Sequence, residues 1–345
     1  MTEIFDARLH GGPCARAIAA IGGGSGLSML LRSLKPALRS GKIGQLTAIV
    51  TVSDDGGSSG RLREDYGIIA PGDIRNCLVA LADEEDVLGR LFQFRFDGTN
   101  GLAGHSFGNL FMTALTSITG DFYEAILVAE RILAVTGRVL PSTLANVRLV
   151  AEGTSGTTYS GESAIGACAE PLATLSLDPG SPAAFPPAVA AIESADLVLI
   201  GPGSLFTSIL PNLMIPAIRE ALVQRRGPSV LLLNLMTQPG ETTGMDGQAH
   251  LDALSRHAGD GLVDYVLGNT SRPTHEQLER YAAQGSTPVG LERIQGTPNP
   301  FELVEVPLLG EGVMVRHDAA KLSAAILALP SGRSAAMSGL SVAAG

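Results

Sequence analysis

The stretch AIAAIGGGSGLSMLLRSL, residues 17–34, decides the fold class. Its first five residues form a short apolar run, which is typical of a buried strand. A glycine-rich turn follows, and from Leu27 onward leucines recur at positions 30, 31 and 34, the spacing of one apolar helical face. A buried strand that runs through a glycine turn into an amphipathic helix is the repeating unit of a parallel α/β sheet. We therefore predict a strand at 17–21 and a helix from 27 to 38.

The same pattern recurs along the chain. Short apolar runs at 46–52, 197–200, 230–235 and 263–267 each end in a polar or glycine-rich loop. Strands that are apolar throughout are buried on both faces, as in a parallel sheet between two helical layers. We expect an α/β fold: a Rossmann-like, mostly parallel sheet with helices on both faces. Ligands bind beyond the carboxyl ends of such strands, so these loops should gather at one edge.

The remaining segments suggest a single domain. Residues 73–133 have a helical pattern, whereas 139–176 are richer in Val, Thr and Gly and predict a small antiparallel excursion. We expect one α/β domain over 15–329, preceded by a flexible segment at 1–14 and followed by a disordered tail at 330–345.

Composition restricts the class of protein. The 345 residues are 45% hydrophobic and 17% charged, the profile of a folded globular chain. The net charge of −10 repels nucleic acids, although backbone amides can still hold the phosphates of a single nucleotide. Cys14, Cys77 and Cys168 are too widely spaced for a zinc motif and fit a reducing compartment. Because no signal peptide and no apolar window of about 18–20 residues is present, we expect a cytoplasmic protein without a membrane span.

The first glycine loop, Gly22 to Gly26, is a candidate phosphate site. Glycines allow a phosphate to approach backbone amides at a helix N-terminus, where the helix dipole adds positive potential. The loop is not a dinucleotide fingerprint, because Met29 stands in the third glycine position, and it lacks the Gly-Lys-Ser/Thr of a P-loop. The alternative is that the glycines serve turn geometry alone.

The second loop, SDDGGSSGR at 53–61, places Asp54 and Asp55 directly after a predicted strand. Adjacent carboxylates there could hold Mg²⁺ together with substrate phosphates, or accept a hydrogen bond from a ribose hydroxyl. The alternative is a turn in which an aspartate caps the following helix.

Two further polar motifs precede predicted helices. In PGDIRN, 71–76, Asp73 is placed as an N-cap, while Arg75 and Asn76 could face the crevice. In GHSFGN, 104–109, the histidine could hydrogen-bond a ligand, cap the helix or pack. A nucleophile-elbow sequence is absent, so hydrolase chemistry has little support.

Seven motifs occur in an order that is specific to one family. They are IGGGSGL (21–27), TVSDDGGSSGRLRE (51–64), PGDIRN (71–76), GHSFGN (104–109), SITGD (117–121), GPGSL (201–205) and MTQPGET (236–242). In this order they resemble the bacterial YvcK-type proteins, often called gluconeogenesis factors, which are related to the CofD-type 2-phospho-L-lactate transferases. The resemblance covers about residues 17–327 and implies a CofD-like α/β fold.

The resemblance also implies a function. It predicts a UDP-sugar ligand, UDP-N-acetylglucosamine in particular, and a regulatory role that links gluconeogenic carbon use to cell-wall synthesis and cell shape. We accordingly expect a binding protein more than an enzyme, a homo-oligomer, and no required cofactor, with Mg²⁺ as an optional ion.

Carried over residue by residue, the resemblance implies a set of nucleotide-binding positions. They are Gly23, Gly24, Ser25, Gly26, Asp54, Asp55, Asn76, His105, Asn109, Gly203, Thr237, Tyr281 and Arg316, with Asp54 and Asp55 also the Mg²⁺ candidates. Tyr281 would stack on uracil and Arg316 would pair with phosphate; the alternatives are helix packing and a surface ion pair. Ser25 replaces the family's usual threonine but keeps the hydroxyl, and residues 269–273 do not align with the family pattern.

Three functions compete at this point. The sensor hypothesis is favoured by the run from Ser58 to Glu64, a mark of the YvcK branch. A CofD-type transferase would move a phosphorylated small acid onto an acceptor alcohol, with Mg²⁺ at Asp54 and Asp55 neutralising a diphosphate. An NAD(P)-dependent oxidoreductase shares the fold class but lacks its glycine fingerprint.

Overall fold

The structure is a computed structural model that describes residues 15–83, 87–99, 101–295 and 299–330. The predicted flexible segment at 1–14 and all of the predicted tail after Pro330 lie outside these residues.

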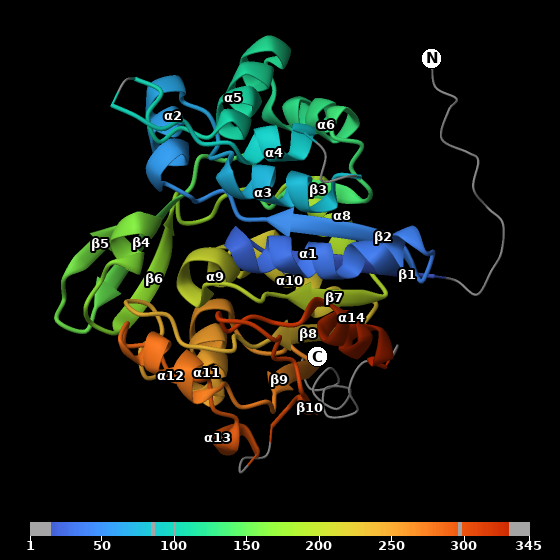
Figure 1. The fold of residues 1–345 in the computed structure, drawn as a ribbon, viewed down its shortest axis with the longest axis vertical. Helices are drawn as coiled ribbons and strands as arrows, with labels where there is room; N and C mark the ends of the chain where they lie inside the picture. The colour runs from blue at the N-terminus through green and yellow to red at the C-terminus, as the bar shows by residue number, and fades with distance from the viewer. Residues whose placement is uncertain (1–14, 84–86, 100, 296–298, 331–345) are drawn as a thin grey trace.

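A seven-stranded sheet forms the centre of the molecule, and all of its paired strands are parallel (Figure 1). The strand order is β10-β9-β8-β7-β1-β2-β3. The strands are β1 (Arg16–Gly22), β2 (Ile43–Val50), β3 (Arg138–Pro141), β7 (Leu197–Ile200), β8 (Ser229–Leu232), β9 (Tyr265–Asn269) and β10 (Glu302–Val306). The predicted Rossmann-like parallel sheet is therefore confirmed.

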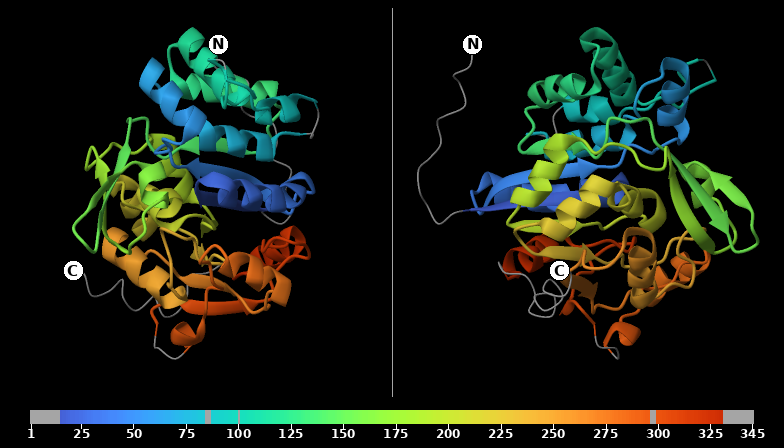
Figure 2. Two further views of the ribbon diagram at one scale, coloured as in Figure 1. Left: turned by 60° about the vertical axis from the view of Figure 1, so that its left-hand side comes forward. Right: turned by 180° about the vertical axis from the view of Figure 1, so that it is seen from behind.

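Alternate residues of β1 belong to two hydrophobic cores, because successive side chains of a strand point to opposite faces. Ile18 and Ala20 lie in one core and Ala19 and Ile21 in the other. The first core is covered by α1 (Gly24–Arg39), α3 (Gly72–Leu81), α6 (Phe122–Ile132) and α14 (Ala319–Ala328). The second is covered by α8 (Pro186–Ser194), α10 (Pro216–Gln224) and α11 (Gly247–Ala258), of which Figure 2 shows α8 and α10 from behind.

Two excursions leave the central sheet. Between β2 and β3 the chain forms a helical layer that also contains α2 (Gly57–Tyr66), α4 (Val87–Gln93) and α5 (Phe107–Thr119). A three-stranded antiparallel sheet of order β5-β4-β6 follows β3. Its elements are β4 (Arg148–Gly153), β5 (Thr158–Ser160), α7 (Glu162–Gly166) and β6 (Leu172–Asp178).

The predicted antiparallel excursion thus exists, but its proposed start at 139 is wrong. Val139 and Leu140 belong to β3, which pairs in parallel with β2. The physical reason is burial: both residues are enclosed, one in each core, as in the other central strands. The strands β4 and β6 instead alternate buried with more exposed residues, the pattern of a sheet that is open on one face.

The remaining short elements surround the carboxyl edge of the sheet. They are the π-helix η1 (Leu205–Ile209), α9 (Leu210–Leu213), α12 (His275–Ala282) and α13 (Glu292–Gln295). Within the described ranges, no helix has the length and apolar character needed to cross a bilayer. Cys77 and Cys168 are buried free thiols.

Candidate functional site

The glycine turn after β1 is built by close packing. The N-cap of α1 is Gly23, which offers no side-chain cap, and Gly24 has a φ of +60°. A Cβ at Gly23 would lie 2.5 Å from Thr51 Cγ2, and a Cβ at Gly26 would lie 2.2 Å from the carbonyl oxygen of Pro202. The glycines are therefore required by geometry, and they seat the N-terminus of α1 between the loops that follow β2 and β7.

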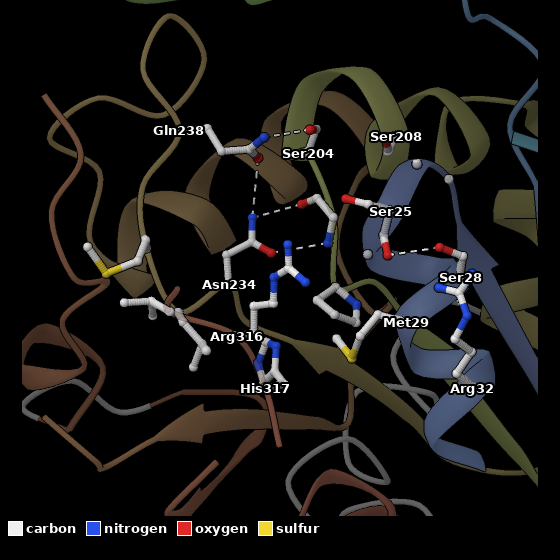
Figure 3. Close-up of a pocket in the computed structure, with 18 residues that line it drawn as sticks. Ser25, Ser28, Met29, Arg32, Ser204, Ser208, Asn234, Gln238, Arg316 and His317 are labelled. Atoms are coloured by element: carbon white, nitrogen blue, oxygen red, sulfur yellow. Dashed lines mark hydrogen bonds between the residues drawn. The ribbon is translucent and has the colours of Figure 1, made fainter. Parts of the chain in front are cut away.

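A cleft of about 510 Å³ opens at this N-terminus (Figure 3). Its walls come from α1, from the loops after β7 and β8, and from a segment that precedes α14. The lining residues are Gly23, Gly24, Ser25, Gly26, Ser28, Met29, Arg32, Pro202, Gly203, Ser204, Ser208, Asn234, Leu235, Met236, Gln238, Val315, Arg316 and His317. Loops that are far apart in the sequence thus meet at one rim, as the parallel sheet predicts.

The charge of the cleft is opposite to that of the whole chain. Of the described lining residues none is acidic, whereas Arg32 and Arg316 are exposed guanidiniums from two different elements. Neither arginine forms an ion pair with a carboxylate that the structure describes, so the predicted alternative of a surface ion pair for Arg316 is wrong. Burial lowers the pKa of His317 to about 4, so this side chain is neutral at pH 7. An anionic ligand fits such a lining.

Asn234 holds one wall of the cleft in place (Figure 3). The Gly203 amide donates to Asn234 Oδ1 at 3.1 Å, and Asn234 Nδ2 donates to the Gly203 carbonyl at 2.8 Å. Next to it, Gln238 Nε2 donates to Ser204 Oγ at 2.7 Å. The loop after β7 is therefore fixed by side chains from the loop after β8, which preorganises the rim.

Asp73 lies behind the glycine turn and does not cap α3. The N-cap of α3 is Pro71, and Asp73 occupies the first helical turn, so the predicted N-cap role is wrong. Its carboxylate approaches the turn closely: a Cβ at Gly23 would lie 2.6 Å from Asp73 Oδ2, and the Gly24 amide donates to the carboxylate. Burial, followed by the nearby Asp54 charge, raises the pKa of Asp73 to about 6.

The carboxylates of Asp54 and Asp55 accept hydrogen bonds from different parts of the backbone. Asp54 Oδ1 accepts from the Gly56 amide at 2.8 Å, and Asp55 Oδ1 accepts from the Ser163 amide at 2.9 Å. The second carboxylate oxygens also diverge: Asp54 Oδ2 lies against the backbone at 72, and Asp55 Oδ2 against the backbone at 161. The two carboxylates do not converge on a shared ion, and the described residues contain no cluster of three or more metal-ligating side chains. Mg²⁺ can also be held by a single carboxylate together with phosphate oxygens, so the Mg²⁺ role of these aspartates stays a prediction.

Two glutamates, the half-buried Glu162 and the buried Glu241, adjoin these aspartates and were not predicted. Burial, followed by the charges of Asp73, Asp54 and Glu241, raises the pKa of Glu162 to about 9, so Glu162 is protonated at pH 7. Burial also raises the pKa of Glu241, whose Oε1 accepts from Thr207 Oγ1 at 3.0 Å. The sequence could not predict these raised pKa values, because the burial of a single glutamate depends on segments that are distant in the chain.

His105 and Asn109 connect two helices away from the cleft lining. His105 Nδ1 and Ser58 Oγ are 3.1 Å apart, and Asn109 Nδ2 donates to Ser59 Oγ at 3.2 Å. Burial is the main cause that lowers the pKa of His105. These contacts join α5 to α2, so the motif at 104–109 packs against the polar run after β2.

The other predicted residues outside the lining also have protein partners. Asn76 Oδ1 accepts from Arg75 at 2.6 Å, Thr237 Oγ1 accepts from the amide of residue 287 at 2.9 Å, and Tyr281 Oη donates to the Val315 carbonyl at 3.4 Å. Six of the thirteen predicted positions line the cleft: Gly23, Gly24, Ser25, Gly26, Gly203 and Arg316. The binding role of all thirteen stays a prediction.

Several polar lining residues were not among the predicted binding positions, although two of them, Ser204 and Gln238, lie within the motifs at 201–205 and 236–242. The full set is Ser28, Arg32, Ser204, Ser208, Asn234, Gln238 and His317. Helical spacing could have found two of them, because Ser28 and Arg32 are four residues apart and share one face of α1. Asn234 and His317 lie in unremarkable sequence, and only the fold brings them to the rim.

The fold and the cleft define a class of protein: a Rossmann-like α/β protein with a cationic cleft at the carboxyl edge of its parallel sheet. The chain belongs to the CofD family, because residues 18–309 match the family described as 2-phospho-L-lactate transferase CofD. A protein of Aquifex aeolicus is 48% identical over 315 residues, which cover 90% of this chain and 95% of that relative. A relative from Bacillus subtilis, named gluconeogenesis factor, is 42% identical over 313 residues, which cover 90% of this chain and 97% of that protein.

Solved structures agree with the family and the fold. A crystal structure of a Bacillus halodurans protein is 41% identical, has a TM-score of 0.85, and covers 90% of this chain and 99% of that one. A second crystal structure from the same organism, described as a member of the UPF0052 family, also has a TM-score of 0.85 at 41% identity and covers 92% of this chain and 100% of that one. The predicted YvcK-type, CofD-like membership is therefore confirmed.

Proposed function

We propose that the cleft binds a nucleotide sugar through its diphosphate, with UDP-N-acetylglucosamine as the first candidate. One observation carries this proposal: Arg32 and Arg316 reach the cleft from separate elements, and its described lining contains no carboxylate. Two guanidiniums balance the charge of a diphosphate ester, and the uncapped N-terminus of α1 adds positive potential. A cleft of about 510 Å³ is within the usual size range of small-molecule sites.

The biological role in this proposal is regulatory. Relatives from Bacillus subtilis and Halalkalibacterium halodurans, both 42% identical to this chain, are named gluconeogenesis factors. We propose that this cytoplasmic chain senses a nucleotide sugar and links gluconeogenic carbon use to cell-wall synthesis and cell shape. In this role, occupancy of the cleft changes the contacts that the protein makes.

Calorimetric titration with UDP-N-acetylglucosamine, UDP, GDP and NAD tests the ligand. We expect Arg316→Ala to weaken UDP-N-acetylglucosamine and UDP binding by roughly 10- to 100-fold, the range for a charge-assisted hydrogen bond. Arg219→Ala is the matched control, because Arg219 is an exposed arginine on α10 that does not line the cleft. Heat with GDP or NAD but with neither UDP ligand would reject the proposal, and so would an Arg316→Ala variant that binds UDP as tightly as the wild type.

A CofD-type transfer reaction is the second candidate. Asp73 is buried against Gly23, which lines the cleft, and its pKa of about 6 suits a residue that would accept the hydroxyl proton of an alcohol. The test is incubation with an acceptor alcohol and a small hydroxy acid that is joined through its hydroxyl to the β-phosphate of a nucleoside diphosphate, followed by ³¹P NMR. Attack of the alcohol oxygen on the β-phosphorus would form a phosphodiester and release the nucleoside monophosphate. A new phosphodiester signal that disappears in Asp73→Asn would favour the transferase over the sensor.

A further inference from the structure

The segment that brings Arg316 to the cleft is a short hairpin, residues 309–318, which we call the strap. Its two arms meet at an antiparallel bridge between Leu309 and His317. The Gly310 amide donates to the Arg316 carbonyl at 2.9 Å, and the Asp318 amide donates to the Leu308 carbonyl at 2.8 Å. Figure 3 shows the Arg316 side chain in the middle of the cleft, close to Asn234. The position of the strap therefore sets the position of this cation.

The tip of the strap has little core packing of its own. Residues 311–314 are exposed, including Val313 at 55% and Met314 at 44% of their surface. Val315 is the buried residue next to the tip, and its exposed fraction is 8%. Because apolar contacts are sparse at the tip, polar contacts from neighbouring elements have a large share in fixing it.

Helix α12 makes such polar contacts with the strap. Gln277 is 4% exposed, and its Nε2 donates to the Gly312 carbonyl at 2.7 Å. One helical turn later, on the same face, Tyr281 Oη donates to the Val315 carbonyl at 3.4 Å. The Gln277 bond is the shorter of the two and comes from a side chain with almost no freedom to move.

The other end of the Gln277 amide is fixed as well. Gln277 Oε1 accepts from the Thr274 amide at 2.8 Å, and Thr274 Oγ1 accepts from the Gln277 amide, so the two residues form the capping box of α12. The Gln277 side chain thus spans from the first turn of α12 to the tip of the strap. Because Oε1 faces the Thr274 amide, Nε2 of the same side chain faces the Gly312 carbonyl.

We propose that Gln277 is a positioning residue that fixes the strap and so holds Arg316 where it pairs with the diphosphate. This inference rests on the proposed function of the cleft. Tyr281 does not line the cleft. It packs against the core and supports the strap from behind, through its contact with Val315. Gln277 itself touches no ligand; it acts through Arg316.

The test separates the capping role of Gln277 from its contact with the strap. At pH 8, Gln277→Glu keeps an oxygen that can accept from the Thr274 amide but has no hydrogen to donate to Gly312. Thr274→Ala is the matched control, because it removes the other half of the capping box and leaves the Gln277 contact with Gly312. Calorimetry with UDP gives the affinity, and thermal melting reports on the fold.

We expect Gln277→Glu to weaken UDP binding by about 2- to 12-fold, the equivalent of one net hydrogen bond, and Thr274→Ala to lower the melting temperature with affinity unchanged. In the Arg316→Ala background, Gln277→Glu should have no further effect on affinity, because the residue acts through Arg316. Gln277→Met replaces Gln277→Glu if the latter fails to fold.

Two results would overturn the positioning role. One is an unchanged affinity in Gln277→Glu, and the other is an equal loss in the wild-type and Arg316→Ala backgrounds. A wild-type protein that binds neither UDP nor UDP-N-acetylglucosamine would instead reject the proposed function, which keeps the two failures distinct.

Discussion

Replacing Asp73 with asparagine should stabilise the protein at alkaline pH. The carboxyl group is buried behind the glycine turn, and burial raises its pKa from the ordinary 3.8 to about 6. An asparagine oxygen can still accept from the Gly24 amide, so Asp73→Asn removes the charge and keeps the shape. One pKa unit corresponds to about 1.4 kcal/mol, so the ionised carboxylate costs the folded state roughly 3 kcal/mol.

The sign follows from proton linkage. Since the folded pKa of Asp73 lies above the unfolded value, the stabilising effect of its proton is complete below pH 3.8 and is lost as the pH rises through 6. The difference in unfolding free energy between Asp73→Asn and wild type should therefore be close to zero near pH 4. At pH 8 the variant should be more stable by roughly 3 kcal/mol.

Urea denaturation at pH 4, 6 and 8 measures this difference. Asp65→Asn, at an exposed position on α2, is the control for exchanging an aspartate for an asparagine outside the core. If Asp73→Asn were less stable than wild type at pH 8, or if the difference did not change between pH 4 and 8, the carboxylate would be a stabilising acceptor and the reasoning would be wrong.

One further perturbation tests the packing at the cleft, and another tests a buried ion pair at the opposite edge of the sheet. Gly26→Ala should destabilise the protein by about 1–3 kcal/mol in urea denaturation and weaken UDP binding, because the new Cβ would lie 2.2 Å from the Pro202 carbonyl. Gly166→Ala, where nothing lies within 4 Å, should change stability much less, and a similar loss in both variants would contradict the packing argument. Asp264→Ala should destabilise by about 3–5 kcal/mol, because it leaves the fully buried guanidinium of Arg225 without its carboxylate; a loss below 1 kcal/mol in urea denaturation would contradict this.

Much of the fold could be predicted because its signals are local. The apolar run at 17–21 lies within β1, and the run at 197–200 coincides with β7. Each of these strands can be recognised from a few neighbouring apolar residues, and the glycines at 22–26 indicate a tight turn. One error, the assignment of residues 139–141 to an antiparallel segment, arose because strand partners cannot be deduced from a short run.

The candidate site was predicted less completely. Gly203 and Arg316, predicted as binding positions from the family resemblance, line the cleft, whereas Arg32, Asn234 and His317 were not recognised. Their roles depend on which face of an element turns toward the cleft. The same holds for Tyr281, which the sequence suggested as a stacking ring and which the structure places behind the strap, with its hydroxyl on a backbone carbonyl.

The amino-acid sequence alone determined the alternation of strands and helices, the glycine turn that opens α1, and the family. Only the tertiary structure decided that Asp73 lies against Gly23, that Arg32 and Arg316 share one cleft, and that Gln277 holds the strap. The physical reason is range. Hydrophobic periodicity and turn chemistry act between residues a few positions apart, whereas burial, pKa values and the convergence of charges depend on segments that are close only after folding.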